Sequence, residues 1–93
     1  MNPVPRTALV IDPDPSVLSR IAGTLAHSGL RIATRLSPED ALEYVARSRP
    51  DVVLLGIAYW QDGWGAEILA ASPASVVLPV VDAPQAPRTQ GVA

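Results

Sequence analysis

Two aspartates each directly follow a short apolar run, at the carboxyl end of a predicted strand, where α/β proteins usually have their functional residues. Asp12 follows the run 8–11, and Asp82 follows the run 76–81. Carboxylates at two strand ends could coordinate a weakly held cation. The simpler interpretation of Asp12 is a carboxylate that is hydrated or accepts hydrogen bonds from loop amides. We therefore expect no metal site and no cofactor.

The composition excludes several classes of site. The chain has no cysteine and one histidine, His27, so disulfides, cysteine nucleophiles and multi-histidine metal sites cannot form. Nine acidic residues outnumber seven arginines, there is no lysine, and the net charge is −2, so the basic face that grips nucleic acid is missing. No catalytic triad or glycine-rich phosphate loop is visible. We expect neither an enzyme nor direct nucleic-acid binding.

The aromatic residues are concentrated in one predicted loop. Tyr59, Trp60 and Trp64 are three of the four aromatics of the chain. One interpretation is that they close the top of a small core. The other is a recognition surface, because tyrosine and tryptophan are favoured anchors at interfaces. The sequence leaves both open.

Four short apolar runs predict the strands that position these residues. They are expected at 8–11, 30–33, 52–55 and 76–81. Unbroken apolar runs of this length are typical of parallel strands covered on both faces. Pro79 removes one donor from the ladder of the last strand, and a proline there favours a sheet edge or a bulge.

Proline also marks the starts of the predicted helices. The Asp-Pro pair at 14–15 and the Ser-Pro pair at 37–38 each combine a capping side chain with a proline suited to the first turn. Gly29 is placed to close the first helix in the left-handed conformation. A third, short helix is expected around 65–71, after a loop at 57–63.

The alternation of strands and helices implies parallel pairing and right-handed crossovers, with helices on both faces of the sheet. Residues 1–6 are expected to be an extended lead-in, 7–83 the domain and 84–93 a proline-rich tail. The longest charge-free stretch, 68–81, is shorter than the roughly 20 apolar residues of a membrane span. We expect a cytoplasmic protein that does not enter a membrane.

Four segments in register resemble the receiver domain of two-component response regulators. They are Leu-Val-Ile-Asp-Pro-Asp-Pro at 9–15, Ser-Pro-Glu-Asp-Ala-Leu at 37–42, Pro-Asp-Val-Val-Leu-Leu-Gly-Ile at 50–57, and Asp-Gly at 62–63. The resemblance covers residues 7–83. It implies a flavodoxin-like, doubly wound parallel sheet, truncated here from five strands to four in the order 2-1-3-4, with three helices.

The departures from this resemblance concern the reactive centre. The resemblance implies two adjacent acids that hold Mg²⁺, and this chain has Asp12 followed by Pro13. It implies a phosphoacceptor aspartate where this chain has Gly56, and a hydroxyl residue where it has Asp82. The implied phosphate-contacting lysine would lie in a fifth strand. Because glycine offers no nucleophile, we expect a degenerate receiver that works without phosphorylation.

Stopping after four strands would leave exposed apolar surface. Val76, Leu78 and Val80 would lie on an edge strand, and part of one sheet face would lack a covering helix. Either the tail folds back over this surface or a second chain covers it. We expect a protein partner or a two-fold homodimer.

The leading hypothesis is therefore a pseudo-receiver that acts as an interaction or dimerisation module in signalling or regulation. One alternative makes the vacated phosphorylation pocket a small-molecule sensor lined by Asp12, Gly56, Tyr59 and Asp82. Another is the receiver fragment of a transcriptional regulator.

Overall fold

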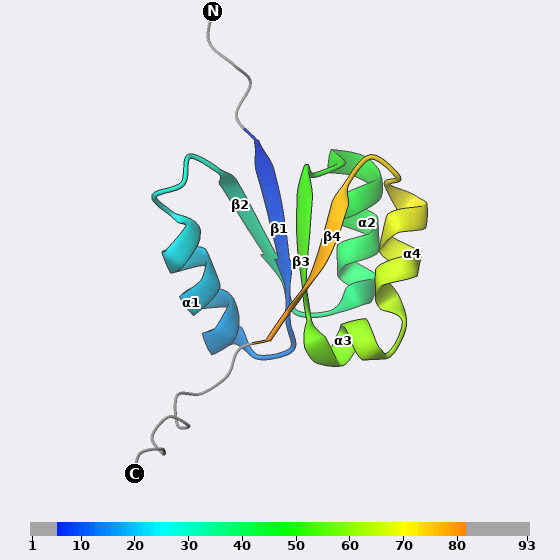
Figure 1. The fold of residues 1–93 in the computed structure, drawn as a ribbon, viewed down its shortest axis with the longest axis horizontal. Helices are drawn as coiled ribbons and strands as arrows, with labels where there is room; N and C mark the ends of the chain where they lie inside the picture. Colours follow the sequence, from blue (N-terminus) through cyan, green and yellow to red (C-terminus); the bar gives the residue numbers. More distant parts are fainter. Residues whose placement is uncertain (1–5, 82–93) are drawn as a thin grey trace, which may run out of the picture.

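The computed structural model describes residues 6–81, which form one four-stranded parallel sheet in the order β2-β1-β3-β4 (Figure 1). The strands are β1 (Thr7–Ile11), β2 (Arg31–Arg35), β3 (Val52–Gly56) and β4 (Val76–Val80). The helices are α1 (Pro15–Leu25), α2 (Pro38–Ser48), α3 (Ile57–Gln61) and α4 (Trp64–Ala71). The predicted sheet order is confirmed. The predicted number of helices is wrong, because the structure has four.

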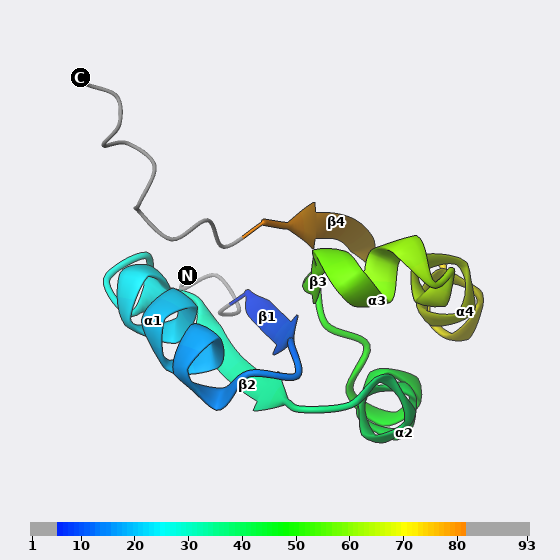
Figure 2. The same ribbon diagram turned by 90° about the horizontal axis from the view of Figure 1, so that it is seen from below.

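One face of the sheet is sealed by α2 and α4. Its core consists of seven buried residues from β1, β3 and both helices: Leu9, Ile11, Ala41, Val45, Val53, Leu55 and Ile68. Figure 2 shows α2, α3 and α4 together on this side of the sheet and α1 alone on the other. We call the two sides the α2/α4 face and the α1 face.

The α1 face is covered over the β1–β2 half of the sheet. α1 packs on β1 and β2. Ala8 and Val10 of β1 are buried there, as are Val17 and Leu18 of α1. Successive strand residues alternate between faces, so Val52 and Leu54 of β3 lie on the same face as Ala8 and Val10, to which they are paired in register.

The predicted caps begin the first two helices. Asp14 accepts a hydrogen bond from the Ser16 amide, and Ser37 accepts one from the Asp40 amide. Gly29 has the left-handed φ of +83° that its type permits, but α1 ends earlier, at Leu25. Gly29 therefore belongs to the turn after the helix, not to its cap.

The loop predicted at 57–63 is wrong over its first five residues, which form α3. Nothing from Ile57 to Gln61 is glycine or proline, and the first residue after Gly56 with a left-handed backbone is Gly63, at φ +92°. A helix of five residues is too short to show a helical period in the sequence, so the pattern gave no sign of it.

Pro79 lies on the outer edge of the sheet and does not interrupt the β3–β4 ladder. The amide of Val76 donates to the carbonyl of Asp51, and Val76 pairs with Val52. In a parallel ladder alternate residues turn their backbone groups to the same neighbour, so the backbone groups of Val76, Leu78 and Val80 point towards β3. The nitrogen of Pro79 faces away. The predicted loss of a ladder donor is therefore wrong, and the predicted edge position is confirmed.

The expected lead-in at 1–6 and tail at 84–93 lie, apart from Arg6, outside the described residues. Within residues 6–81, no helix has the length and apolar character needed to cross a bilayer.

Candidate functional site

The carboxyl ends of β1 and β3 bring Asp12 and Gly56 into contact. A Cβ atom built on Gly56 would overlap Asp12 Oδ2, and it would lie 3.1 Å from Asp12 Cγ and 3.2 Å from the carbonyl oxygen of Ile11. The Asp12 carboxylate therefore occupies the space into which a side chain at position 56 would extend.

Asp12 is held in place by the loop that follows it. Its Oδ1 accepts a 2.9 Å hydrogen bond from the amide of Asp14. This is the bond to a loop amide that the simpler interpretation of Asp12 predicts. Asp14 in turn accepts bonds from the Ser16 hydroxyl at 2.8 Å and the Ser16 amide at 2.9 Å. The Ser16 side chain is the largest cause of a lowered pKa at Asp14.

The two other positions singled out at this edge have different outcomes. Pro13 is exposed and lines the cavity described next. Asp82 lies outside the described residues. Among residues 6–81, no three acidic or histidine side chains gather to hold a metal ion.

A cavity of about 450 Å³ opens beside Asp12, between α1 and the ends of β3 and β4. Its walls carry two carboxylates, one guanidinium and several apolar groups: Asp12, Pro13, Asp14, Val17, Arg20, Ile57, Ala58 and Val80. Neither Gly56 nor Tyr59 lines it, so the pocket expected from the sequence has a different composition in the structure. The sequence pattern did not indicate that α1 would contribute Val17 and Arg20.

The three clustered aromatics have separate roles. The Tyr59 hydroxyl donates a 2.7 Å hydrogen bond to the carbonyl of Leu36, which ties α3 to the loop after β2. Tyr59 and Trp64 pack against the α2/α4 core. Burial first, and then the charges of Asp12 and Glu39, raise the pKa of Tyr59. For these two rings, the structure agrees with the interpretation that they close over the core.

Trp60 differs from the other two aromatics because 38% of it is exposed. Its ring lies over Gly65, where an added Cβ would approach the ring carbons to 3.3 Å. Together with Leu69 and Val77 it lines an apolar cavity of about 420 Å³ beside β4. Trp60 is therefore the most exposed of the three clustered aromatics.

The predicted edge residues of β4 lie on the α1 face and are poorly covered. Val76 is 54% exposed and Leu78 is 46% exposed, whereas Val80 is half-buried beside the cavity next to Asp12. Val76 pairs with Val52, and Leu78 pairs with Leu54. The β3–β4 half of the α1 face is therefore an exposed apolar surface.

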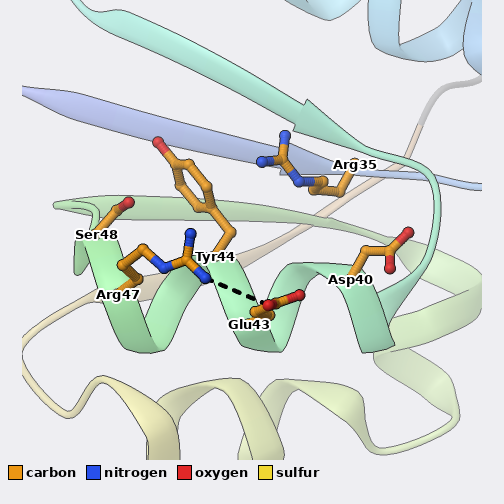
Figure 3. A pocket seen from close by; sticks show the side chains of 6 residues that line it. All are labelled: Arg35, Asp40, Glu43, Tyr44, Arg47 and Ser48. Atoms are coloured by element: carbon orange, nitrogen blue, oxygen red, sulfur yellow. Dashed lines mark hydrogen bonds and ion pairs between the residues drawn. The ribbon is translucent and has the colours of Figure 1, made fainter.

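A polar groove between β2 and α2 gave no signal in the sequence (Figure 3). The guanidinium of Arg35 lies 4.6 Å from the centre of the Tyr44 ring, and Arg47 forms a 3.3 Å ion pair with Glu43. Asp40 completes a set of two positive and two negative side chains. This balance gives the groove no preference for a ligand of either charge.

The chain matches no family model and no curated protein. It is similar to solved structures. A response regulator from Thermotoga maritima matches with a TM-score of 0.75 and 15% identity, over 84% of this chain and 67% of that one. The N-terminal domain of a response regulator receiver protein from Methanoculleus marisnigri JR1 matches with a TM-score of 0.72 and 29% identity, over 88% of this chain and 71% of that one.

Proposed function

We propose that this chain, which has the receiver fold of response regulators, is a phosphorylation-independent pseudo-receiver that acts as a protein-interaction module. The receiver fold suggests a role in signalling, and receiver domains are in general signalling modules rather than enzymes. The observation that carries the proposal is Gly56, which stands at the position of the expected phosphoacceptor with the Asp12 carboxylate in its side-chain space.

Three features of the site oppose phosphoryl transfer. Glycine supplies no carboxylate to attack phosphorus. The Asp12 carboxylate would lie against an incoming phosphoryl group with like charge. Stabilising the equatorial oxygens needs nearby positive charge, and the chain has no lysine. Arg20 does line the neighbouring cavity, but Asp12 and Asp14 share that cavity and offset its charge.

The direct test is incubation with Mg²⁺ and a small phosphodonor such as acetyl phosphate, followed by intact-mass measurement. A receiver that carries the phosphoacceptor aspartate is treated in parallel as the positive control. We expect the control to gain a phosphoryl group and this chain to keep its mass. A phosphorylated species of this chain would overturn the proposal.

A second candidate is supported by the cavity beside Asp12. Its volume of about 450 Å³ lies within the usual range for small-molecule sites, and it opens where ligands bind in sheets of this kind. The function would be a sensor for a small molecule that carries both charged and apolar groups.

A thermal-shift screen tests the sensor candidate with a panel of nucleotides, amino acids and cationic metabolites. A ligand of this cavity raises the melting temperature of the wild-type chain and has no effect on an Arg20→Ala variant. If no member of a broad panel shifts the wild type, the sensor candidate is wrong and the interaction role remains.

A further inference from the structure

The outward surface of α1 is unusually free of charge for an exposed helix. The exposed residues on the side of α1 away from the sheet are Ser16, Ser19, Arg20, Gly23 and Thr24. Arg20 is the only charged residue of the helix, and it lines the same cavity as Asp14, whose pKa its charge helps to lower. A helix surface that faces water is normally rich in charge. This one consists mainly of short side chains.

Gly23 is part of that surface and lies in the last turn of α1. An added Cβ would have no atom within 4 Å, so no contact within the chain requires a glycine here. A glycine in a helix interior lowers helix stability relative to alanine. A common reason to keep one is the close approach of another backbone or surface.

Beside α1, the sheet offers a partly exposed apolar surface of matching size. This surface, which we call the shelf, consists of Val52, Leu54, Val76, Leu78 and Val80 on the α1 face of β3 and β4. The eleven residues of α1 and the five residues of β4 both extend about 16 Å. One helix the length of α1 would cover the shelf.

The shelf is better suited to a helix than to an added strand. The free edge of β4 lacks a donor at Pro79, whose nitrogen faces outward, so a strand paired to that edge would lose a hydrogen bond at its centre. The twelve residues that follow Val81 include Pro84, Pro87 and only one large aliphatic side chain, Val92. Their composition does not favour a helix with an apolar face.

We propose that the occupant of the shelf is α1 of a second copy of this chain, and that the exchange is reciprocal. A two-fold axis parallel to the strands, with the two α1 faces opposed, places each α1 on the shelf of the other copy. The two helices then lie side by side between two sheets, which is a closed, isologous arrangement. This inference rests on the proposed interaction role and names its partner.

The positions of the residues of α1 and β4 along the strand direction agree with this geometry. α1 starts at the carboxyl end of the sheet and runs back against the strand direction (Figure 1). Its outward residues Ser16, Ser19 and Gly23 therefore lie about level with Val80, Leu78 and Val76, respectively. Gly23 of one copy would lie on Val76 of the other.

The test uses charged variants on each side of the proposed contact, measured by sedimentation velocity across dilution. We expect the wild type to dimerise. Gly23→Glu and Val76→Lys should each weaken the dimer at least about 100-fold, the effect of burying an unpaired charge. Ala46→Glu makes a similar charge change on the exposed surface of α2 and is the matched control, which should dimerise as the wild type does.

Mixing the two variants tests the reciprocity. In a mixed dimer, one contact pairs the introduced carboxylate with the introduced ammonium group, and the other contact is wild type. Equal amounts of Gly23→Glu and Val76→Lys should therefore form a heterodimer although neither variant dimerises alone. The charged side chains are placed on exposed positions, so circular dichroism should show that both variants stay folded.

Three results would overturn the inference. They are a wild type that is monomeric at every concentration, a dimer that survives both substitutions, and a mixture that stays monomeric. None of these bears on phosphorylation. A phosphorylated chain would instead overturn the proposed function, so the two failures are distinguishable.

Discussion

The two faces of this sheet differ in how completely helices cover them and in the charge that their helices carry. On the α2/α4 face, residues of β1, β3, α2 and α4 form one fully buried core, and the outward surface of α2 carries several charges, among them Glu43 and Arg47. On the α1 face, a single helix with one charged residue covers half of the sheet. Val76 and Leu78 of the other half are about half exposed.

This difference indicates that the α2/α4 face stabilises the fold, whereas the α1 face is available for contact with another molecule. On the α2/α4 face, the apolar strand residues are covered and the charges lie on the outside. This is expected for a sheet face that is covered by helices of its own chain. The α1 face leaves apolar strand residues open and presents a nearly uncharged helix beside them. We therefore expect substitutions on the first face to change monomer stability, and substitutions on the second face to change association.

The largest expected effect comes from removing a core side chain on the α2/α4 face. Ile68 is fully buried, so Ile68→Ala should lower the free energy of unfolding by about 3 kcal/mol. Leu78→Ala on the shelf is the matched change, and it should cost the monomer less than about 1 kcal/mol because nearly half of Leu78 is already exposed. Urea denaturation at a concentration that keeps the chain monomeric measures both. Equal losses would contradict the comparison.

A smaller effect on the free energy of unfolding is expected at the carboxyl ends of β1 and β3, where Gly56 contacts Asp12. Gly56→Ala should cost about 1–2 kcal/mol, because the new Cβ displaces the Asp12 carboxylate from the amide of Asp14. In an Asp12→Ala background the same substitution should cost clearly less, since the displaced group is gone. A double-mutant cycle from urea denaturation gives the coupling. Additive losses would show that Asp12 does not occupy the space beside Gly56.

Next in size is the hydrogen bond that fastens α3 over the α2/α4 core. Tyr59→Phe keeps the ring and removes the bond to the Leu36 carbonyl, so it should cost about 1 kcal/mol. The raised pKa of Tyr59 adds a pH dependence. Folding holds this proton more tightly, so stability is lost as pH rises above the ordinary value of 10.0. Thermal unfolding should show that loss in the wild type and not in Tyr59→Phe.

The smallest effect concerns the cap of α1, the helix that covers half of its face. The folded chain lowers the pKa of Asp14 from 3.8, so its contribution to stability is present above that value and is lost as pH falls through the folded pKa. Asp14→Asn keeps a capping side chain but cannot titrate. The two melting temperatures should differ little at neutral pH, and the acid-dependent part carried by Asp14 should be absent from the variant. Identical acid profiles would contradict this role.

The elements with strong local signals were predictable from the sequence. The four apolar runs and the capping pairs at 14–15 and 37–38 indicated the strands and the first two helices, and the resemblance to receiver domains implied the sheet order. The features that depend on contacts between distant segments were not. The short α3 has no period to detect. The C-cap residue of α2, Arg49, has a left-handed φ of +48°, a conformation that its residue type does not suggest.

The candidate site was predictable in its positions and not in its geometry. The resemblance placed Asp12 and Gly56 at neighbouring strand ends, but only the folded chain shows that the Asp12 carboxylate fills the space beside Gly56. The exposed apolar residues of β4 followed from counting strands and helices. The small, uncharged surface of α1 beside them could be read from its composition only once its outward side was known.

Both proposals together hold that this receiver fold makes its contacts through the α1 face and without phosphoryl chemistry. Amide correlation NMR of the labelled chain tests it residue by residue, with dilution as one perturbation and Mg²⁺ with beryllofluoride as the other. We predict that dilution shifts the amides of Gly23 and Val76, and that beryllofluoride leaves Asp12 and Gly56 unmoved. Beryllofluoride shifts at Gly56 that spread to β4, with no response of Gly23 to dilution, would contradict the account.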